Sequence, residues 1–415
     1  MLGTLIALTA LGSTTLAQSG VQPVQIVKRG DQFVLQRNGK PYFIRGVGGA
    51  QMLPELAAIG GNSFRTWGAD RLDKELEEAK RLDLTVCAGI WLGHKRHGFN
   101  YGDEKQVAEQ HAKALEVVRK HKDHPSLLVW GLGNEVELDG DDPKAWKAIN
   151  DLAKAVKQID PNHPTMTVIA EIGGNKIERM KTLCPDVDIL GVNSYAGLAS
   201  LPERLKAAGW TKPYIVTEYG PPGPWEVGKT AWDAPIEPTS TEKATTYATN
   251  YAKGIESQPL CLGSYAFLWG NKQEGTSTWF GMMLPTGEKT GPVDMLAKAW
   301  GRPRANQAPI LRKLDANVAR QKVSKGTAIE AVALAMDPDR DRLTYRWVLQ
   351  AEQTERGSGG DLEKVPPVMG TQVDPLGTGR VTFGGLQRPG AYRLFVFITD
   401  GKGNAATGNI PFMVE

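Results

Sequence analysis

The sequence predicts an α/β fold, a (β/α)8 TIM barrel followed by a C-terminal β-sandwich. From residue 42 to about residue 300, short apolar runs alternate with segments of helical periodicity, the pattern of βα units that build a parallel sheet. Eight such units can be counted, which is the number that closes a barrel. After residue 308 the pattern changes to alternating, β-rich runs separated by Asp, Pro and Gly turns, which favours a sandwich.

The eight strands are expected where each apolar run is followed by a helical segment. NSFRTW, for example, precedes RLDKELEEAKRLD, and SLLVWGLGNE precedes DPKAWKAINDLAKAVKQID. The predicted strands cover residues 42–47, 62–67, 84–92, 126–135, 165–171, 188–195, 214–220 and 262–269.

The ends of the chain complete the predicted domain organisation. Residues 1–17 are apolar and end in Thr15-Leu16-Ala17, which predicts a signal peptide and a secreted or periplasmic protein. The catalytic barrel is expected over 22–300 and includes an N-terminal hairpin at 24–40 that would plug or flank the barrel entrance. A Pro- and Gly-containing linker follows at 301–308, and the sandwich occupies 309–415.

Composition limits the partners. The 49 basic and 46 acidic residues nearly balance, and no Lys/Arg run predicts binding to nucleic acid or to a membrane surface. No stretch is apolar enough to predict a membrane span. Cys87, Cys184 and Cys261 lack the spacing of metal ligands, so buried free thiols are expected, without a metal or another cofactor. The sequence makes no prediction of oligomeric state.

Two glutamates end predicted strands on the same rim of the barrel. Glu135 ends the fourth strand in WGLGNE, and Glu218 lies at the end of the seventh in VTEYG. Active sites of parallel barrels form at the carboxyl ends of the strands. Two carboxylates there with different pKa values are what retaining glycoside hydrolysis needs, with Glu135 as acid/base and Glu218 as nucleophile. Glu137, Asp139 and Glu171 are alternative carboxylates, of which Glu137 and Asp139 are expected to be solvated and Glu171 to line the cleft.

The stretches HPSLLVWGLGNE and TEYG resemble the acid/base and nucleophile strands of glycoside hydrolase family 2 and its relatives in clan A. The resemblance covers roughly residues 40–300 and implies a retaining β-glycosidase whose partner is a carbohydrate substrate. It also implies that Arg65 lies near the nucleophile, that Asn134 contacts the sugar 2-hydroxyl, and that Tyr195, with Asn193 nearby, bonds the nucleophile. Trp269 would be the aromatic platform for the sugar. A structural ion pair is the alternative for Arg65, and a core tyrosine for Tyr195.

Other aromatic residues are predicted to form sugar subsites. Trp225 and Trp232 lie in the long loop 221–240, and Trp279 and Phe280 follow the eighth strand. Trp91 lies near the end of the third strand, beside the polar residues 94–97. Two histidines at His94 and His97 are expected to contact substrate or solvent and not a metal.

The prediction of the substrate depends on resemblance alone. GNEV and EYG are also similar to clan A enzymes of β-1,3-glucans, and no sandwich precedes this barrel as in family 2, so a β-glucan, β-1,3-linked by preference, is predicted. A transglycosylase using the same residues and a non-catalytic carbohydrate-binding surface protein are the rivals.

The C-terminal region resembles immunoglobulin-like and PKD-like modules through its DPDxDxLTYxW and TDGxGNxA frames. Its residues Asp337, Asp339 and Asp341 are interpreted as an Asp-rich turn, with calcium binding as the alternative.

Overall fold

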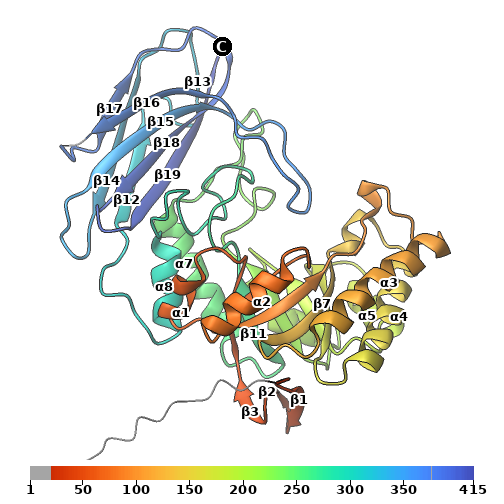
Figure 1. Cartoon of the computed structure of the whole chain (residues 1–415). Coiled ribbons are helices and arrows are strands. Elements are labelled where there is room, and N and C mark those ends of the chain that lie inside the picture. The colour runs from red at the N-terminus through yellow and green to blue at the C-terminus, as the bar shows by residue number, and fades with distance from the viewer. Residues whose placement is uncertain (1–19, 375) are drawn as a thin grey trace, which may run out of the picture.

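The protein, described here from a computed structural model of residues 20–374 and 376–415, consists of a closed barrel and a C-terminal pair of sheets (Figure 1). The predicted signal peptide, residues 1–17, lies outside the described residues. No helix in the described ranges is long and apolar enough to cross a membrane.

Eight parallel strands close the barrel, as predicted. Their order around it is β10-β11-β4-β5-β6-β7-β8-β9. The strands are β4 (Ile44–Gly48), β5 (Ser63–Arg65), β6 (Thr85–Ile90), β7 (Leu127–Asn134), β8 (Thr165–Ala170), β9 (Ile189–Asn193), β10 (Tyr214–Tyr219) and β11 (Cys261–Ala266). All eight lie within the predicted ranges or within a residue of them.

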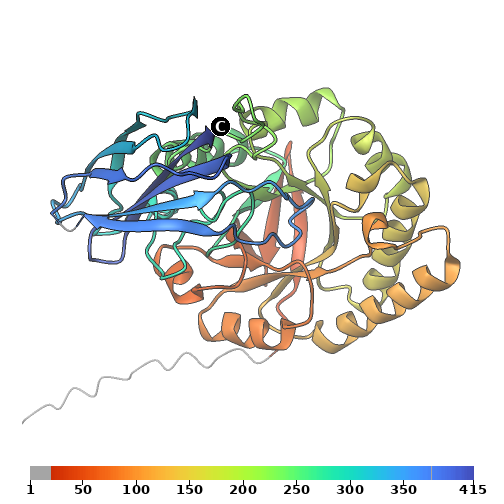
Figure 2. The ribbon, with the colours of Figure 1, turned by 90° about the horizontal axis from the view of Figure 1, so that it is seen from above.

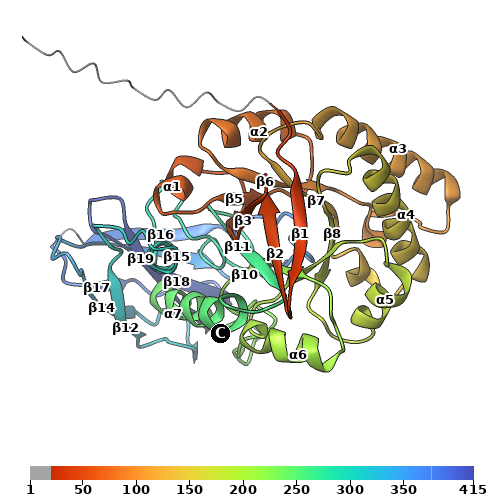
Figure 3. The ribbon, with the colours of Figure 1, turned by 90° about the horizontal axis from the view of Figure 1, so that it is seen from below.

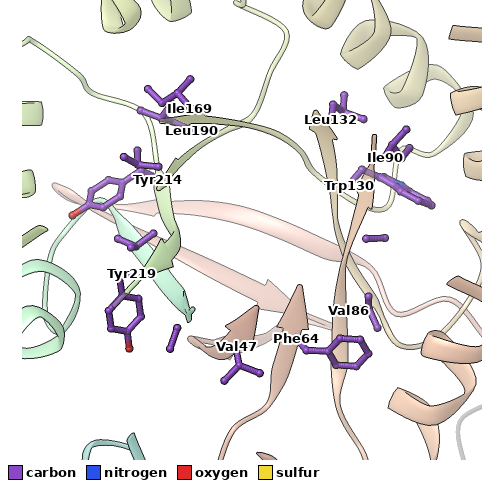
Figure 4. Close-up of a cluster of buried hydrophobic side chains, with 14 of the residues drawn as sticks. Val47, Phe64, Val86, Ile90, Trp130, Leu132, Ile169, Leu190, Tyr214 and Tyr219 are labelled. Carbon is purple, nitrogen blue, oxygen red and sulfur yellow. The ribbon is translucent and has the colours of Figure 1, made fainter. Parts of the chain in front are cut away.

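Helices connect the strands and cover the outside of the barrel. They are α1 (Leu53–Ala58), α2 (Leu72–Arg81), α3 (Glu104–His121), α4 (Pro143–Ile159), α5 (Lys176–Leu183), α6 (Leu201–Ala207), α7 (Ser240–Asn250) and α8 (Gly291–Ala299). Side chains that alternate along the strands pack outward against them. Figure 4 shows this layer around the barrel, including Phe64, Trp130 and Tyr214, each at most 1% exposed.

The N-terminal hairpin lies at the end of the barrel opposite the predicted active site. It forms a three-stranded sheet of β1 (Val24–Arg29), β2 (Gln32–Arg37) and β3 (Lys40–Tyr42). Val24 N donates to Asn162 O and Phe33 N to Pro259 O, and both acceptors lie just before barrel strands begin. The hairpin therefore covers the amino-terminal mouth (Figure 3), and it does not flank the entrance to the site.

The C-terminal region contains two β-sheets with a common apolar core, which agrees with a sandwich. One sheet has the order β12-β14-β17 and the other β13-β19-β18-β15-β16. The strands are β12 (Ile310–Ala316), β13 (Lys322–Val323), β14 (Ile329–Met336), β15 (Thr344–Ala351), β16 (Val368–Asp374), β17 (Arg380–Phe383), β18 (Gly390–Thr399) and β19 (Ala405–Val414). The predicted linker, 301–308, falls between α8 and β12.

Buried polar contacts join the sheets to the barrel. Glu237, in the loop after β10, pairs with Lys243 at 2.5 Å and accepts a hydrogen bond from Asn409 of β19 at 2.6 Å. Arg393 of β18 donates to Pro235 O at 2.9 Å and pairs with Glu352 at 2.8 Å. Because charged groups leave water only where they are paired, these contacts hold the sheets in one position on the barrel.

The acidic turn of the C-terminal region has the predicted geometry. Asp337 Oδ1 accepts hydrogen bonds from the backbone N–H groups of Asp339 and Asp341. Ligand atoms of Asp337, Asp341 and Asp400 lie within 4.8 Å of one another. Elsewhere, Cys87, Cys184 and Cys261 are buried free thiols, as predicted.

Candidate active site

Glu135 is aimed into the barrel mouth by an irregular end of β7. The pairing register with β8 shifts between Gly131 and Asn134, and Gly133 has φ +77°. Glu135 itself has φ +52°, a left-handed conformation that non-glycine residues seldom adopt. Such conformations concentrate where a side chain must be held in an unusual direction, as at active sites.

Glu218 is placed by a similar irregularity in β10. The register with β9 shifts between Val216 and Glu218. Val216 packs in the outer layer of the barrel, whereas Glu218 lines the cavity at the mouth. A bulge next to an active site commonly redirects a side chain in this way.

Both glutamates lie in one cavity of about 930 Å³. This size is at the upper end for small-molecule sites and admits more than one sugar ring. Polar side chains line its base and aromatic side chains its walls, together with residues of the C-terminal region. The lining includes Trp67, Trp91, Asn134, Glu171, Asn193, Tyr195, Trp225, Phe267, Leu268, Lys272, Glu274 and residues 356–361.

Three donors hold the carboxylate of Glu218. Arg65 Nη1 and Trp67 Nε1 donate to Oε1 at 2.9 and 2.8 Å, and Tyr195 Oη donates to Oε2 at 2.8 Å. Arg65 is 2% exposed and lies beneath the cavity. A guanidinium and two neutral donors around a nearly buried carboxylate suit an anion of fixed orientation.

Glu135 has a different environment. Its Oε1 accepts a hydrogen bond from Asn193 Nδ2 at 2.7 Å, and no cation pairs with it among the described residues. Burial of the carboxyl, reinforced by the negative charge of Glu218, raises the pKa of Glu135 to about 7. A carboxyl that keeps its proton near neutral pH can act as a general acid.

A hydrogen-bonded chain connects the two glutamates. Asn134 Oδ1 accepts from Arg65 Nη2 at 2.6 Å and from Asn193 Nδ2 at 3.2 Å. Thr217 Oγ1 donates to Asn193 Oδ1 at 2.7 Å and so fixes the orientation of that amide. Since the Asn134 oxygen is occupied, its NH2 group is the part available to a sugar hydroxyl.

Most of the predicted site residues meet in the cavity, but three tryptophans do not. Trp269 is fully buried in the main core and donates to Met52 O, because the chain turns inward after β11 ends at Ala266. Trp279 is also fully buried and donates to Pro222 O, so it supports the long loop from below. Trp232 is half-buried and lies outside the cavity lining. The predictions that Trp269 and Trp279 contact sugar are wrong, because neither side chain is exposed, whereas a sugar contact of Trp232 outside this cavity stays a prediction.

Trp91 and Trp225 do face the cavity. They are 44% and 61% exposed, the sort of surface on which a sugar ring can stack. Trp225 meets Tyr195 edge to face, with ring centroids 5.9 Å apart.

The alternative carboxylates are engaged in other contacts. Glu171 lines the cavity as expected, but Arg204 pairs with it at 2.9 Å. Although burial raises the pKa of Glu171, hydrogen bonds from Arg204 and Ser194 bring it below its ordinary value. Glu137, expected to be solvated, has a 6% exposed side chain that accepts from Ala170 N.

Sequence reasoning missed several residues of the site. Trp67 lies two residues after Arg65 in the NSFRTW stretch. Its position just past the strand end could have indicated that its side chain belongs to the site. Phe267 and Leu268, which are joined by a cis peptide bond, line the wall after β11. Residues 356–361 of the C-terminal region carry no local signal, because their place in the cavity depends on contacts far away in sequence.

Comparison with known proteins agrees with this geometry. The model of the glycosyl hydrolases family 2 TIM barrel domain matches residues 86–228, a range that contains both glutamates. Over these residues the barrel is similar to that of the family 2 glycosyl hydrolases. The match covers β6 to β10, the strands that carry Glu135 and Glu218 at two of their ends.

The curated relatives of the chain are distant. β-Glucuronidases of Paenibacillus borealis and Homo sapiens are 24% and 26% identical over 49% and 48% of the chain. A β-galactosidase of Photobacterium profundum is 28% identical over 36% of the chain. The chain spans only 38%, 34% and 16% of the lengths of these relatives.

Solved structures show the same fold. The chain superimposes on Bacteroides uniformis β-glucuronidase with a TM-score of 0.51 and 15% identity, over 94% of this chain and 48% of that one. For Ruminococcus gnavus β-glucuronidase the TM-score is 0.53, with 16% identity over 67% and 53%. These comparisons give no support to the predicted resemblance to β-1,3-glucanases, and the preference for a β-1,3-glucan substrate is withdrawn with it.

Proposed function

We propose that the protein is a retaining β-glycosidase in which Glu218 is the nucleophile and Glu135 the acid/base. One observation carries the proposal: two glutamates share a cavity, one hydrogen-bonded by a guanidinium and two neutral donors and the other with its pKa raised to about 7. Opposite environments for two carboxyls are the requirement of a double displacement.

The reaction has two steps. Glu218 attacks the anomeric carbon while Glu135 gives its proton to the leaving oxygen, so the glycosidic bond breaks and a covalent glycosyl-enzyme forms. Glu135, now a carboxylate, takes a proton from water, and the water oxygen replaces Glu218 at the same carbon. A sugar hydroxyl in place of water would give transglycosylation, which product chromatography distinguishes.

For the sugar, the relatives make a β-glucuronide the first candidate, since most of them carry the name β-glucuronidase. Such a substrate brings a carboxylate, which needs a cation. Lys229, Lys272 and Arg356 line the cavity. Lys272 has the least exposed side chain of the three, and it pairs with Glu274 at 2.8 Å.

A neutral β-glycoside is the second candidate, and the charges of the cavity favour it. Each of the three lining cations has an acidic neighbour: Lys272 pairs with Glu274, and Lys229 and Arg356 both pair with Asp233. Acidic side chains outnumber these cations in the lining, among them Glu171, Glu226, Glu274, Asp361 and Glu363. An anionic sugar would meet repulsion in such a site.

A panel of 4-nitrophenyl glycosides tests the proposal. β-Glucuronide, β-glucoside, β-galactoside and β-mannoside are compared with their α-anomers, and proton NMR follows the anomer first released. Hydrolysis of one β-glycoside with the β-anomer as first product supports the proposal. First release of the α-anomer contradicts retention, and no turnover of any glycoside favours the non-catalytic alternative.

A further inference from the structure

A loop of the C-terminal region crosses the barrel mouth. It comprises residues 352–366, between β15 and β16, and is called the strap below. Figure 1 shows it descending from the C-terminal sheets toward the barrel, and Figure 2, seen from above, shows it reaching over the barrel.

The strap is attached at one side to the loop after β11. Lys272 Nζ donates to Gly360 O at 2.6 Å, and Gly275 N donates to Glu363 Oε2 at 2.8 Å. Glu363 Oε1 also accepts from Gly357 N at 3.0 Å, so this one carboxylate both folds the strap and anchors it.

Its other side contacts the loops after β6 and β7. Asp361 lies 3.5 Å from Arg96 Nε and 3.3 Å from His97 Nε2. Gly359 lies against Leu138, three residues after Glu135, since a Cβ built on this glycine would be 3.4 Å from Leu138 Cδ2. β7 and β11 are four strands apart in either direction around the barrel, so the strap spans its full diameter.

Between these attachments the strap lines the same cavity as the glutamates. Residues 356–361 and Glu363 contribute to it, with Glu135 and Glu218 at the base. The reacting sugar must lie at the base, next to both carboxyls. The rest of a substrate therefore extends toward the mouth, past the strap.

We propose that the strap is a specificity element of the active site, which walls the leaving-group side and selects small leaving groups over large ones. This inference rests on the proposed glycosidase function. It assigns the C-terminal region a direct part in substrate selection beyond bracing the barrel.

A matched pair of tryptophan substitutions tests selection. Ser358 lines the cavity, whereas Leu362, four residues further along the strap, is 94% exposed and outside the lining. The probes are the 4-nitrophenyl and the bulkier phenolphthalein glycosides of the sugar that the wild type cleaves. Ser358→Trp should lower kcat/KM for the phenolphthalein glycoside about tenfold more than for the 4-nitrophenyl glycoside. Leu362→Trp should leave the ratio of the kcat/KM values for the two glycosides unchanged.

Retained cleavage of the 4-nitrophenyl glycoside shows that Ser358→Trp has folded. Equal losses on both probes, or the same ratio in the two variants, would overturn the proposal.

Limited trypsin digestion tests attachment without using glycosidase activity. Cleavage after Arg356 should be slow in the wild type and about tenfold faster in Glu363→Ala, because local opening exposes the strap. Glu355→Ala, an exposed neighbour, is the control and should cleave like the wild type. Equal rates in all three proteins would refute attachment. If no glycoside is cleaved but trypsin shows this pattern, the proposed function fails while attachment of the strap stands.

Discussion

Glu135 and Glu218 differ more in their surroundings than in their positions. Glu135 follows the irregular end of β7 and Glu218 lies in the irregular end of β10, at the same mouth. Glu218, however, receives a guanidinium, an indole and a phenol donor, and Glu135 a single amide. The structure thus distinguishes two identical side chains by the groups placed around them. The donors prepare one carboxyl to attack, and burial prepares the other to hold a proton.

Replacing the nucleophile should have the largest effect. In Glu218→Ala the attacking carboxylate is missing, so kcat should fall by about 10⁴-fold or more. Added azide should restore cleavage of an activated aryl glycoside and yield the α-glycosyl azide, because the small anion attacks from the side that Glu218 vacates. Glu109→Gln, an exposed control on α3, should behave like the wild type. A β-glycosyl azide product would instead assign the acid/base role to Glu218 and the nucleophile role to Glu135.

Replacing the acid should have a smaller effect that depends on the leaving group. Glu135→Ala should slow a substrate with a poor leaving group by about 10²- to 10⁴-fold, the usual contribution of general acid catalysis. A 2,4-dinitrophenyl glycoside, whose leaving group needs no proton, should still form the glycosyl-enzyme rapidly and show a burst of phenol. Equal losses on both substrates would argue against an acid role for Glu135.

The pH profile should follow the proton on Glu135. Because its pKa is about 7, kcat/KM should fall about tenfold per pH unit on the alkaline side of that value. In Glu135→Gln the residual activity should lose this alkaline limb. If the variant kept the alkaline limb, that limb would belong to another group. Glu274 is a candidate, because burial raises its pKa as well.

Replacing Glu135 should affect the stability of the fold less than it affects catalysis, and the direction of the change can be predicted. The pKa of Glu135 is raised from 4.5 to about 7 in the folded protein, so the folded state binds this proton more tightly than the unfolded state. The contribution of this proton to the free energy of unfolding is complete below about pH 4.5 and is lost as the pH rises to about 7. Glu135→Gln should therefore gain stability over the wild type across this range, by at most about 3 kcal/mol. A constant difference in denaturant unfolding from pH 4.5 to 8 would contradict this.

The barrel and its two glutamates were predictable because their signals are local. Each strand is an apolar run before a helical segment, and the glutamates stand directly at two strand ends in WGLGNE and VTEYG. The directions of side chains that follow the strand ends were not predictable. Trp269 comes three residues after β11 and turns into the core, while Trp67 comes two residues after β5 and turns toward Glu218.

The strap could not be predicted for a different reason. Its anchor on Lys272 joins residues 88 positions apart, and the hydrogen bond is made to a backbone carbonyl that any sequence provides. Such contacts arise only when the C-terminal sheets are fixed on the barrel, which depends on buried hydrogen bonds such as those from Asn409 to Glu237 and from Arg393 to Pro235 O.

Trapping the covalent intermediate tests the central claim most directly. The wild type is incubated with the 2-deoxy-2-fluoro, 2,4-dinitrophenyl β-glycoside of its substrate sugar, and the labelled peptide is sequenced by mass spectrometry. The fluorine slows both steps, and the good leaving group lets the intermediate form and persist. We expect one glycosyl group per chain, attached to Glu218. A label on Glu135 or on another residue would contradict the assignment.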